Sequence, residues 1–503
     1  MKKLFKLNKN ELLALLVGVL GNLIAKGIIL FVPTYSIDDY KYLSTTHDTS
    51  FLVSQGRWGL ALVNQVLLSI GIREVFSITI LNFLSFFLMS LIGIIICKMW
   101  KISHNLLLSS FVILLFTTFP YQAEIYTFRI ASSGFAFSMI LAFLSIYISN
   151  FNLKRILLSI FLLTFSLSIY QIAFSYILVV FSFLILIEYL KKENLSVINR
   201  IKNIFTKKSI VAKLITIFGG LLTYLMLNNI ILNASNIQIT KRSKLISFGN
   251  NVEIIDRLHK MGELLTKIYF QNEVIMPFML KFFLLVFLAS AIFLVSKFLF
   301  NKNNFFNSLF NISVFLLIII ILSIIPILPA TILSEWWPVP RLIAAISLFW
   351  CGIVMIIYKK YKNNVTDFLI FFFGSILIFG FLGINNHIFI DQIRINKQDE
   401  NKMNRIVLRL EENPQFKNVN TLAIIGGSWA YQQRAETIYG DMNISAFGAE
   451  WAKLSLINEI SGYKFIKPTI EQFDYASEYC EKSTKWPTKE SITIIDKIGI
   501  ICL

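Results

Sequence analysis

Long apolar segments recur along most of this chain. Each is about 18 to 25 residues long, and a helix of that length crosses the roughly 30 Å hydrocarbon core of a bilayer. The pattern therefore predicts an all-α polytopic membrane protein with about eleven transmembrane helices. The predicted spans lie near residues 11–32, 75–97, 105–119, 131–150, 155–170, 172–190, 210–232, 275–297, 308–330, 342–358 and 366–386.

Two segments do not fit the pattern in which each apolar run forms one transmembrane helix. The stretch 155–190 is too long for a single span, because a helix rises about 1.5 Å per residue, so we divide it at Tyr170-Gln171. Residues 50–70 (FLVSQGRWGLALVNQVLLSI after Ser50) are mixed in character. They predict an amphipathic helix that lies in the membrane interface.

Residues 387–503 show a different pattern. Their apolar stretches are short, as in TLAIIGG and SITIIDKIGIICL, and predict buried strands. Segment 391–412 is polar and predicts a helix. We therefore expect a transmembrane domain over 1–386, followed by a small α/β domain over 387–503.

Composition agrees with a membrane protein. Hydrophobic residues make up 56% of the chain, and mean hydropathy is +0.68. A net charge of +18 would suggest nucleic-acid binding in a soluble protein. Here residues 1–390 supply the whole excess, with 33 basic and 14 acidic residues. Because basic residues collect in cytoplasmic loops, the charge reports topology, and we expect no nucleic-acid partner.

The distribution of basic residues predicts the orientation. With the N-terminus in the cytoplasm, 19 basic residues fall in inner segments and five in short outer loops, while the outer 233–274 loop adds six. An N-terminus inside and eleven spans place the C-terminal domain outside. The expected location is the plasma (inner) membrane, with an extracytoplasmic C-terminus.

The cysteines and histidines of the sequence indicate no metal site and no catalytic motif. The four histidines have no metal-ligand spacing, and the chain has no HExxH, CxxC pair or Walker A loop. Cys97 and Cys351 fall in or beside spans, as small apolar residues. Cys480 and Cys502 lie in the C-terminal domain, and spacing alone leaves their pairing open.

Polar residues gather in the predicted outer loops. Of the 14 acidic residues in 1–390, ten fall on the outer side. Five outer segments also carry dense polar clusters, and this agreement is the strongest functional signal in the sequence. The clusters are Ser36-Ile37-Asp38-Asp39-Tyr40, Gln55-Gly56-Arg57-Trp58-Gly59, Gln122-Ala123-Glu124 with Arg129, Tyr170-Gln171, and Glu335-Trp336-Trp337-Pro338-Val339-Pro340-Arg341.

Asp38 and Asp39 directly follow the first span. They are either two solvated loop carboxylates or a pair in which mutual repulsion raises one pKa into the range of a general base. Two outer carboxylates could also hold Mg²⁺ or Mn²⁺, although two adjacent aspartates alone make a poor cation site. The metal requirement stays open.

The other polar residues have two interpretations each. Arg57, Arg129 and Arg341 are either interface anchors or ligands of a lipid phosphate, which arginine binds in a bidentate manner. Trp336 and Trp337 are either aromatic-belt residues or a platform for a sugar. Glu124 is either a member of a polar network or a catalyst.

These motifs resemble a known family. An SIDDY acidic pair after the first span, a following GRW, a YQ after a middle span and a PxPR together resemble the Gtr-type glucosyltransferase II family of the GT-C superfamily. The resemblance covers roughly residues 10–390. It implies a GT-C-like transmembrane glycosyltransferase domain that takes a sugar, glucose in the family's name, from a polyprenyl-phosphate carrier. The sugar would pass to a cell-surface glycan on the outer face, with inversion at the anomeric carbon.

The resemblance also implies roles for the polar residues. Asp38 or Asp39 would be the base. Ligands of the donor phosphate would be Arg57, Arg341 and Arg129, and groups near the acceptor or in a supporting network would be Glu124, Tyr170, Gln171, Trp58, Glu335 and Trp337. A donor carried in the membrane lipid explains why such an enzyme needs many spans.

Two alternatives remain open from the sequence. A transporter or flippase of lipid-linked sugars would place charged residues near the bilayer midplane, whereas here the spans are nearly free of charge. A glycan ligase or polymerase with a diphosphate-linked donor shares the same topology. Expected partners of a transferase include an upstream polyprenyl-phosphate glycosyltransferase and a small flippase.

Overall fold

A computed structural model describes residues 6–44, 49–191, 197–244, 246, 251–300, 305–361, 364–427 and 435–503. The contacts divide the chain into two compact units. The first, here called the membrane unit, comprises Met1–Leu30, Asp48–Tyr126 and Ala131–Asn386. The second, here called the C-terminal unit, comprises Phe31–His47, Thr127–Ile130 and His387–Leu503. It therefore includes two short segments from the N-terminal third of the chain.

Long apolar helices dominate the described residues. Nine of them are long and apolar enough to cross a membrane, and a tenth candidate is a bent pair. The nine are Lys9–Leu30 (α1 with η1), Ile78–Met99 (α5), Arg129–Ile148 (α8), Ala173–Lys191 (α10), Lys208–Ala234 (α12), Phe278–Phe300 (α14), Phe305–Ile332 (α15 to α16), Pro340–Lys360 (α17 and α18) and Ile370–Glu411 within α19. The bent pair joins α6 (Leu106–Thr117) to Pro120–Thr127 (η2 and α7) at 48°. The prediction of an all-α polytopic protein is confirmed.

The difference from eleven predicted spans lies at 155–170. This segment forms a separate helix, α9 (Leu153–Ile169), of 17 residues. It packs against α12, where Thr164 donates a hydrogen bond to the Gly220 carbonyl at 3.2 Å. The predicted break is confirmed, because α9 ends at Ile169 and α10 begins at Ala173.

Residues 50–70 form two helices and not the single predicted one. α3 (Thr49–Ser54) and α4 (Trp58–Ser69) are separated at Gly56, whose φ is +73°. A residue with a left-handed backbone cannot continue a right-handed helix, and glycine adopts this conformation without steric cost. The chain therefore turns within the GRW motif.

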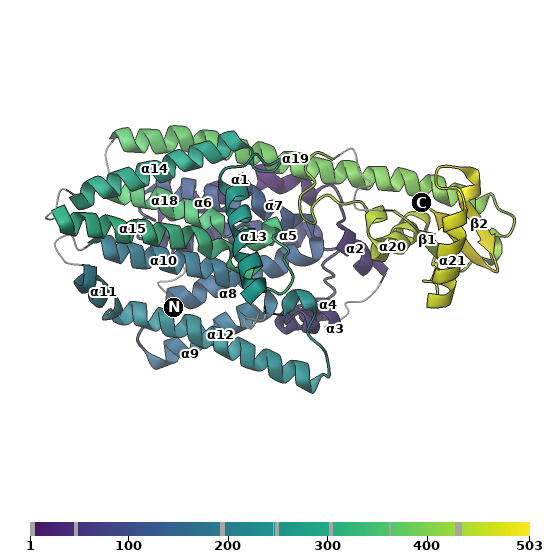
Figure 1. Ribbon diagram of the computed structural model, residues 1–503, viewed down its shortest axis with the longest axis horizontal. Helices are drawn as coiled ribbons and strands as arrows, with labels where there is room; N and C mark the ends of the chain where they lie inside the picture. Colours follow the sequence, from purple (N-terminus) through teal and green to yellow (C-terminus); the bar gives the residue numbers. More distant parts are fainter. Residues whose placement is uncertain are drawn as a thin grey trace. The chain divides into compact units, whose positions relative to one another are not determined.

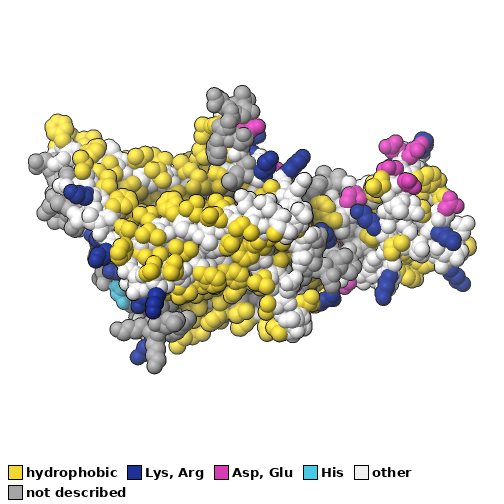
Figure 2. Space-filling model, turned by 90° about the horizontal axis from the view of Figure 1, so that it is seen from below, with side chains coloured by type: hydrophobic (Ala, Val, Ile, Leu, Met, Phe, Trp, Pro, Cys, Tyr) yellow, Lys and Arg dark blue, Asp and Glu magenta, His cyan; other side chains and the backbone are white. Residues whose placement is uncertain are grey.

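Within the membrane unit, α10, α14, α15 and α18 run alongside one another, and α13 (Asn251–Tyr269) lies across them (Figure 1). Other short elements of this unit include η3 (Lys241–Ser243), η4 (Ile325–Ile327) and α11 (Val197–Phe205). Hydrophobic side chains cover a broad part of the surface in Figure 2. On α12 an exposed stripe repeats every four residues, as expected for a helix facing lipid: Phe218, Leu222, Met226 and Ile230.

The C-terminal unit contains a three-stranded sheet in the order β1-β3-β2. β1 (Thr421–Ile425) pairs in parallel with β3 (Ile498–Cys502), and β2 (Ile492–Ile495) pairs with β3 in an antiparallel hairpin. The apolar stretches predicted as strands are therefore strands. The remaining elements of this unit are α2 (Ile37–Ser44), α20 (Glu450–Ser461), α21 (Ile470–Lys482), η5 (Phe416–Asn418), η6 (Ala446–Gly448) and η7 (Lys489–Ser491).

Segment 391–412, predicted as a polar helix, is the end of α19 (Asn364–Glu411). Its apolar side chains build the core of the C-terminal unit with α2, α20 and the sheet. Ile37 and Tyr40 of α2 belong to this core. The acidic pair after the first span is therefore fixed by the same packing that forms the C-terminal unit.

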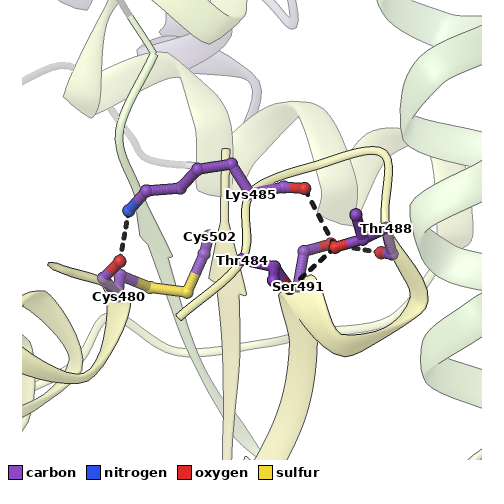
Figure 3. The surroundings of a disulfide bond; sticks show 6 residues. All are labelled: Cys480, Thr484, Lys485, Thr488, Ser491 and Cys502. Atoms are coloured by element: carbon purple, nitrogen blue, oxygen red, sulfur yellow. Dashed lines mark hydrogen bonds between the residues drawn. A yellow bond between two sulfur atoms is a disulfide. The ribbon is translucent and has the colours of Figure 1, made fainter. Parts of the chain in front are cut away.

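A disulfide completes the C-terminal unit. Cys480 at the end of α21 is bonded to Cys502 at the end of β3, with Cα atoms 5.3 Å apart (Figure 3). Lys485 donates to the Cys480 carbonyl, and the backbone N–H of Trp486 donates to the Cys502 carbonyl at 2.8 Å. The pairing that spacing left open is thus present.

Candidate active site

The Asp38-Asp39 pair occupies the first turn of α2, and Ser36 caps this helix. The Ser36 N–H and hydroxyl each donate to Asp39 Oδ2 at 2.8 Å, and the Asp39 N–H donates back to Ser36 Oγ at 3.2 Å. This reciprocal arrangement is a capping box, in which Asp39 takes the place of the usual Glu or Gln. It explains why the helix begins here.

Asp39 also caps the N-terminus of a second helix. Its carboxylate accepts hydrogen bonds from the backbone N–H groups of Arg129 and Ile130, both at 3.2 Å. These are the first two N–H groups of α8, which have no partner within the helix. Asp39 therefore ties two segments of the C-terminal unit together.

The Asp39 side chain is fully buried. Burial raises the pKa of this carboxyl group to about 6, although the donors from Ser36 and Arg129 and the charge of Arg129 act to lower it. Four donated hydrogen bonds occupy its two oxygens. Asp39 thus acts as a buried hydrogen-bond acceptor that stabilises the local fold.

Asp38 has different surroundings. It is partly exposed, and adjacent residues of a helix point about 100° apart. Asp38 therefore presents its carboxylate on another side of α2 from Asp39. Of the two aspartates, Asp38 is therefore the more exposed one.

Arg129 is buried beside the same cap. Its guanidinium donates through Nε to the Thr34 carbonyl and lies 4.1 Å from the centre of the Tyr35 ring. The side chain of Asn396 in α19 holds the backbone of Tyr35. The Tyr35 N–H donates to Asn396 Oδ1 at 2.7 Å, and Asn396 Nδ2 donates to the Tyr35 carbonyl at 2.9 Å. Arg129 is only 5% exposed, so these contacts favour a role in holding the segment 34–39.

In the membrane unit the structure joins two candidates that are far apart in the sequence. The Glu124 carboxylate forms an ion pair with the Arg341 guanidinium at 2.8 Å and accepts the Arg341 backbone N–H at 2.7 Å. Glu124 is fully buried, whereas the Arg341 side chain is 18% exposed. Glu124 therefore orients an arginine that still reaches the surface.

The GRW and YQ motifs also meet. The Arg57 guanidinium lies 4.6 Å from the centre of the Tyr170 ring. Gln171 Nε2 donates to the Gln55 carbonyl and to the Tyr224 hydroxyl, both at 2.9 Å. Tyr224 in turn donates to the Gly56 carbonyl at 3.1 Å. Tyr224 lies in an apolar run of α12, and no sequence signal marked it.

Three other candidates lie apart from these contacts. The Trp58 ring is 6.5 Å from the Phe165 ring of α9. Glu335 and Trp337 both contact Arg242 of η3. The Glu335 carboxylate lies 3.4 Å from Arg242 Nε, and the Arg242 guanidinium lies 5.3 Å from the centre of the Trp337 ring. These contacts give the three residues a packing and pairing role within the membrane unit.

Comparison with family models decides the identity. The model described as Glucosyl transferase GtrII matches residues 27–357, about two thirds of the chain. The chain belongs to this family. It is therefore a membrane-embedded glucosyltransferase that acts on cell-surface glycans, with a sugar donor and a glycan acceptor as substrates. No protein of curated function and no solved structure gives a significant match.

The matched range of this GtrII enzyme contains all the candidate site residues, from Asp38 to Arg341, and most of the candidate spans. Residues 387–503 fall outside it. The family match therefore covers α2 and the membrane unit from η1 to α18, and it leaves α1, α19 and the disulfide-bonded sheet outside.

The described part of the GtrII chain groups no third His, Cys, Asp or Glu side chain with the acidic pair. Among the residues that the structure describes, no three His, Cys, Asp or Glu side chains form a group suited to a metal ion. The Asp39 oxygens already accept four hydrogen bonds. A divalent cation at this point would have to draw most of its ligands from elsewhere.

Proposed function

We propose that this enzyme transfers glucose from a polyprenyl-phosphate carrier to a cell-surface glycan on the extracytoplasmic face, with inversion, and that Asp38 is the general base. The observation that carries the assignment is the unequal environment of the two aspartates. Asp39 is buried and occupied as a cap, whereas Asp38 on the same helical turn is partly exposed. A base must reach the proton that it removes.

The proposed reaction is a single displacement. An acceptor hydroxyl attacks the anomeric carbon, and its proton moves to the Asp38 carboxylate. The bond from the anomeric carbon to the phosphate oxygen breaks, and its electron pair leaves with the polyprenyl phosphate. Attack from the face opposite the leaving group inverts the configuration. One base and one group that binds the phosphate are sufficient for this chemistry.

Arg341 is the proposed ligand of the donor phosphate. An arginine offers a planar set of N–H donors that matches phosphate oxygens. The ion pair with buried Glu124 limits its side chain to few conformations, and 18% of the Arg341 side chain remains exposed. Arg57 is a second ligand, which stacks on Tyr170.

Two observations support the extracytoplasmic location. The basic residues of the chain gather in the segments assigned to the cytoplasm. The Cys480–Cys502 disulfide is of a kind that persists in oxidising compartments and is rare in the cytosol. A nucleotide-linked sugar is not a donor in such a compartment, whereas a membrane-borne phosphate donor is.

The test is a comparison of donors with purified enzyme in proteoliposomes. We expect glucose transfer to a glycan acceptor from polyprenyl-phosphate glucose and none from a nucleotide-linked or diphosphate-linked glucose. NMR of the product should show the anomeric configuration opposite to that of the donor. Transfer from the nucleotide-linked sugar, or a product with retained configuration, would refute the proposal.

A further inference from the structure

The segment that carries Glu124 is a broken helix. α6 ends at Thr117, Pro120 begins η2, and α7 follows from Ala123 to Thr127. A proline has no N–H group, so carbonyls before it lose their partners in the helix. A break inside an apolar bundle requires other donors for these carbonyls.

Three buried side chains supply these donors. Gln122 donates to the Phe116 carbonyl at 2.7 Å. Lys26 of α1 donates to the Thr117 carbonyl at 2.6 Å, and Asn385 of α19 donates to the Thr118 carbonyl at 2.7 Å. The break is thereby held from two other helices.

A buried ion pair holds the same segment from a third direction. The Tyr121 hydroxyl donates to Glu273 Oε2 at 2.5 Å, and Lys281 Nζ contacts the same oxygen at 2.5 Å. Tyr121 is fully buried, and the side chains of Glu273 and Lys281 are each 2% exposed. Neither charged residue was a candidate from the sequence.

The hydrogen bonding of Lys281 is complete. An ammonium group has three N–H donors. Those of Lys281 meet Glu273 and the carbonyls of Lys267 at 2.6 Å and Gln271 at 2.7 Å, at the end of α13. Burying two charges costs free energy, and removal of one partner leaves the other uncompensated. The pair is therefore a rigid anchor, and Tyr121 is its link to the broken helix.

We propose that Glu273 and Lys281 are positioning residues for Arg341, and that they act through Tyr121 and Glu124. Tyr121 lies one helical turn before Glu124 in the segment that the anchor holds. Glu124 then fixes both the backbone N–H and the guanidinium of Arg341. The inference rests on the proposed function, in which Arg341 binds the donor phosphate.

The decisive variant is Tyr121→Phe, which removes the link and leaves the ion pair in place. We expect its KM for polyprenyl-phosphate glucose to rise about tenfold, the size of effect that follows from loss of one hydrogen bond to a charged group. The KM for the glycan acceptor should stay unchanged. Tyr189→Phe is the matched control, because it removes another buried hydroxyl, which donates to Asn311 at 3.0 Å.

Glu273→Gln tests the charged anchor itself and should shift the donor KM in the same direction. Each variant is also combined with Arg341→Lys. If Tyr121 acts through Arg341, Tyr121→Phe should add little in the Arg341→Lys background, because the effects of coupled residues are not additive. A purely structural role would lower the amount of active enzyme and leave the donor KM unchanged.

Three results would contradict the inference. In the first, Arg341→Lys weakens donor binding but Tyr121→Phe behaves like Tyr189→Phe. In the second, the two effects simply add. In both cases the proposed function stands and the positioning role fails. In the third, Arg341→Lys binds donor normally, and then the proposed role of Arg341 fails together with the role of its anchor.

Discussion

At the residue scale, Asp38 and Asp39 are one position apart and have unlike surroundings. The sequence identified the pair and its place after the first span. It could not choose between the two, because the choice depends on the N–H groups of Arg129 and Ile130, about 90 residues away. The hydrogen bonds between Asp39 and Ser36 could be predicted from the sequence, because Ser36 three residues before Asp39 matches a capping pattern.

The pKa of Asp39 gives a prediction for stability. Burial raises it from its usual value of 3.8 to about 6. Between these values the folded state holds a proton that the unfolded chain has released, so the free energy of unfolding falls as pH rises through this window and levels off above it. The expected loss is on the order of 3 kcal/mol.

Asp39→Asn cannot ionise at this position, so its free energy of unfolding should lack this fall with rising pH. The measurement is the thermal midpoint of purified wild-type and variant enzyme from pH 4 to pH 7. The difference between the two proteins should change with pH mainly below about pH 6. A constant difference over the whole range would show that Asp39 ionises as an ordinary exposed carboxyl does.

At the element scale, apolar length predicted most helices, and backbone conformation decided where they break. The break at Tyr170-Gln171 was predicted because one helix over 155–190 would be too long for a bilayer. The break at Gly56 was missed, because a lone glycine does not reveal that its φ is positive. The polar partner Tyr224 was missed for a similar reason, since it lies within an apolar span.

Gly56→Ala tests the importance of that turn. A left-handed conformation costs a non-glycine residue about 1–2 kcal/mol. A Cβ atom at Gly56 would also lie 2.6 Å from the Tyr224 hydroxyl, which Gln171 and the Gly56 carbonyl hold in place.

Gly71→Ala is the matched control. Its φ is +81°, and a Cβ there would meet no atom within 4 Å. We expect Gly71→Ala to show the backbone cost alone and Gly56→Ala to lose at least about 1 kcal/mol more, as judged from thermal midpoints. Equal losses would mean that the contact between Gly56 and Tyr224 contributes nothing.

At the scale of the whole molecule, residues distant in sequence form the C-terminal unit. Residues 31–47 and 127–130 join 387–503, and Ile37 and Tyr40 share a core with Ile406 and Leu422. Hydropathy could locate the spans and the strands. It could not show this assembly, because the core contacts join loops that look like ordinary connections between spans.

The disulfide provides a prediction about compartment. In a Cys97→Ser/Cys351→Ser background only Cys480 and Cys502 remain. Protein from intact cells, denatured and treated with maleimide-polyethylene glycol, should gain no label before reduction and two labels after it, because the pair forms in an oxidising compartment. A further Cys480→Ser change should leave Cys502 open to label without reduction. Two labels before reduction would place the C-terminal unit in the cytoplasm.

The most direct test of the account is the rate of glucose transfer from polyprenyl phosphate by Asp38→Asn enzyme. Asparagine has nearly the same shape as aspartate but cannot accept the acceptor's proton, and general-base catalysis is typically worth about 10²–10⁴-fold. We expect Asp38→Asn to keep the thermal midpoint and donor KM of the wild type and to lose kcat by a factor in this range. Asp39→Asn should instead change the thermal midpoint, in the pH-dependent manner described above. If Asp38→Asn transfers glucose at near wild-type kcat, Asp38 is not the base and the proposed mechanism is wrong.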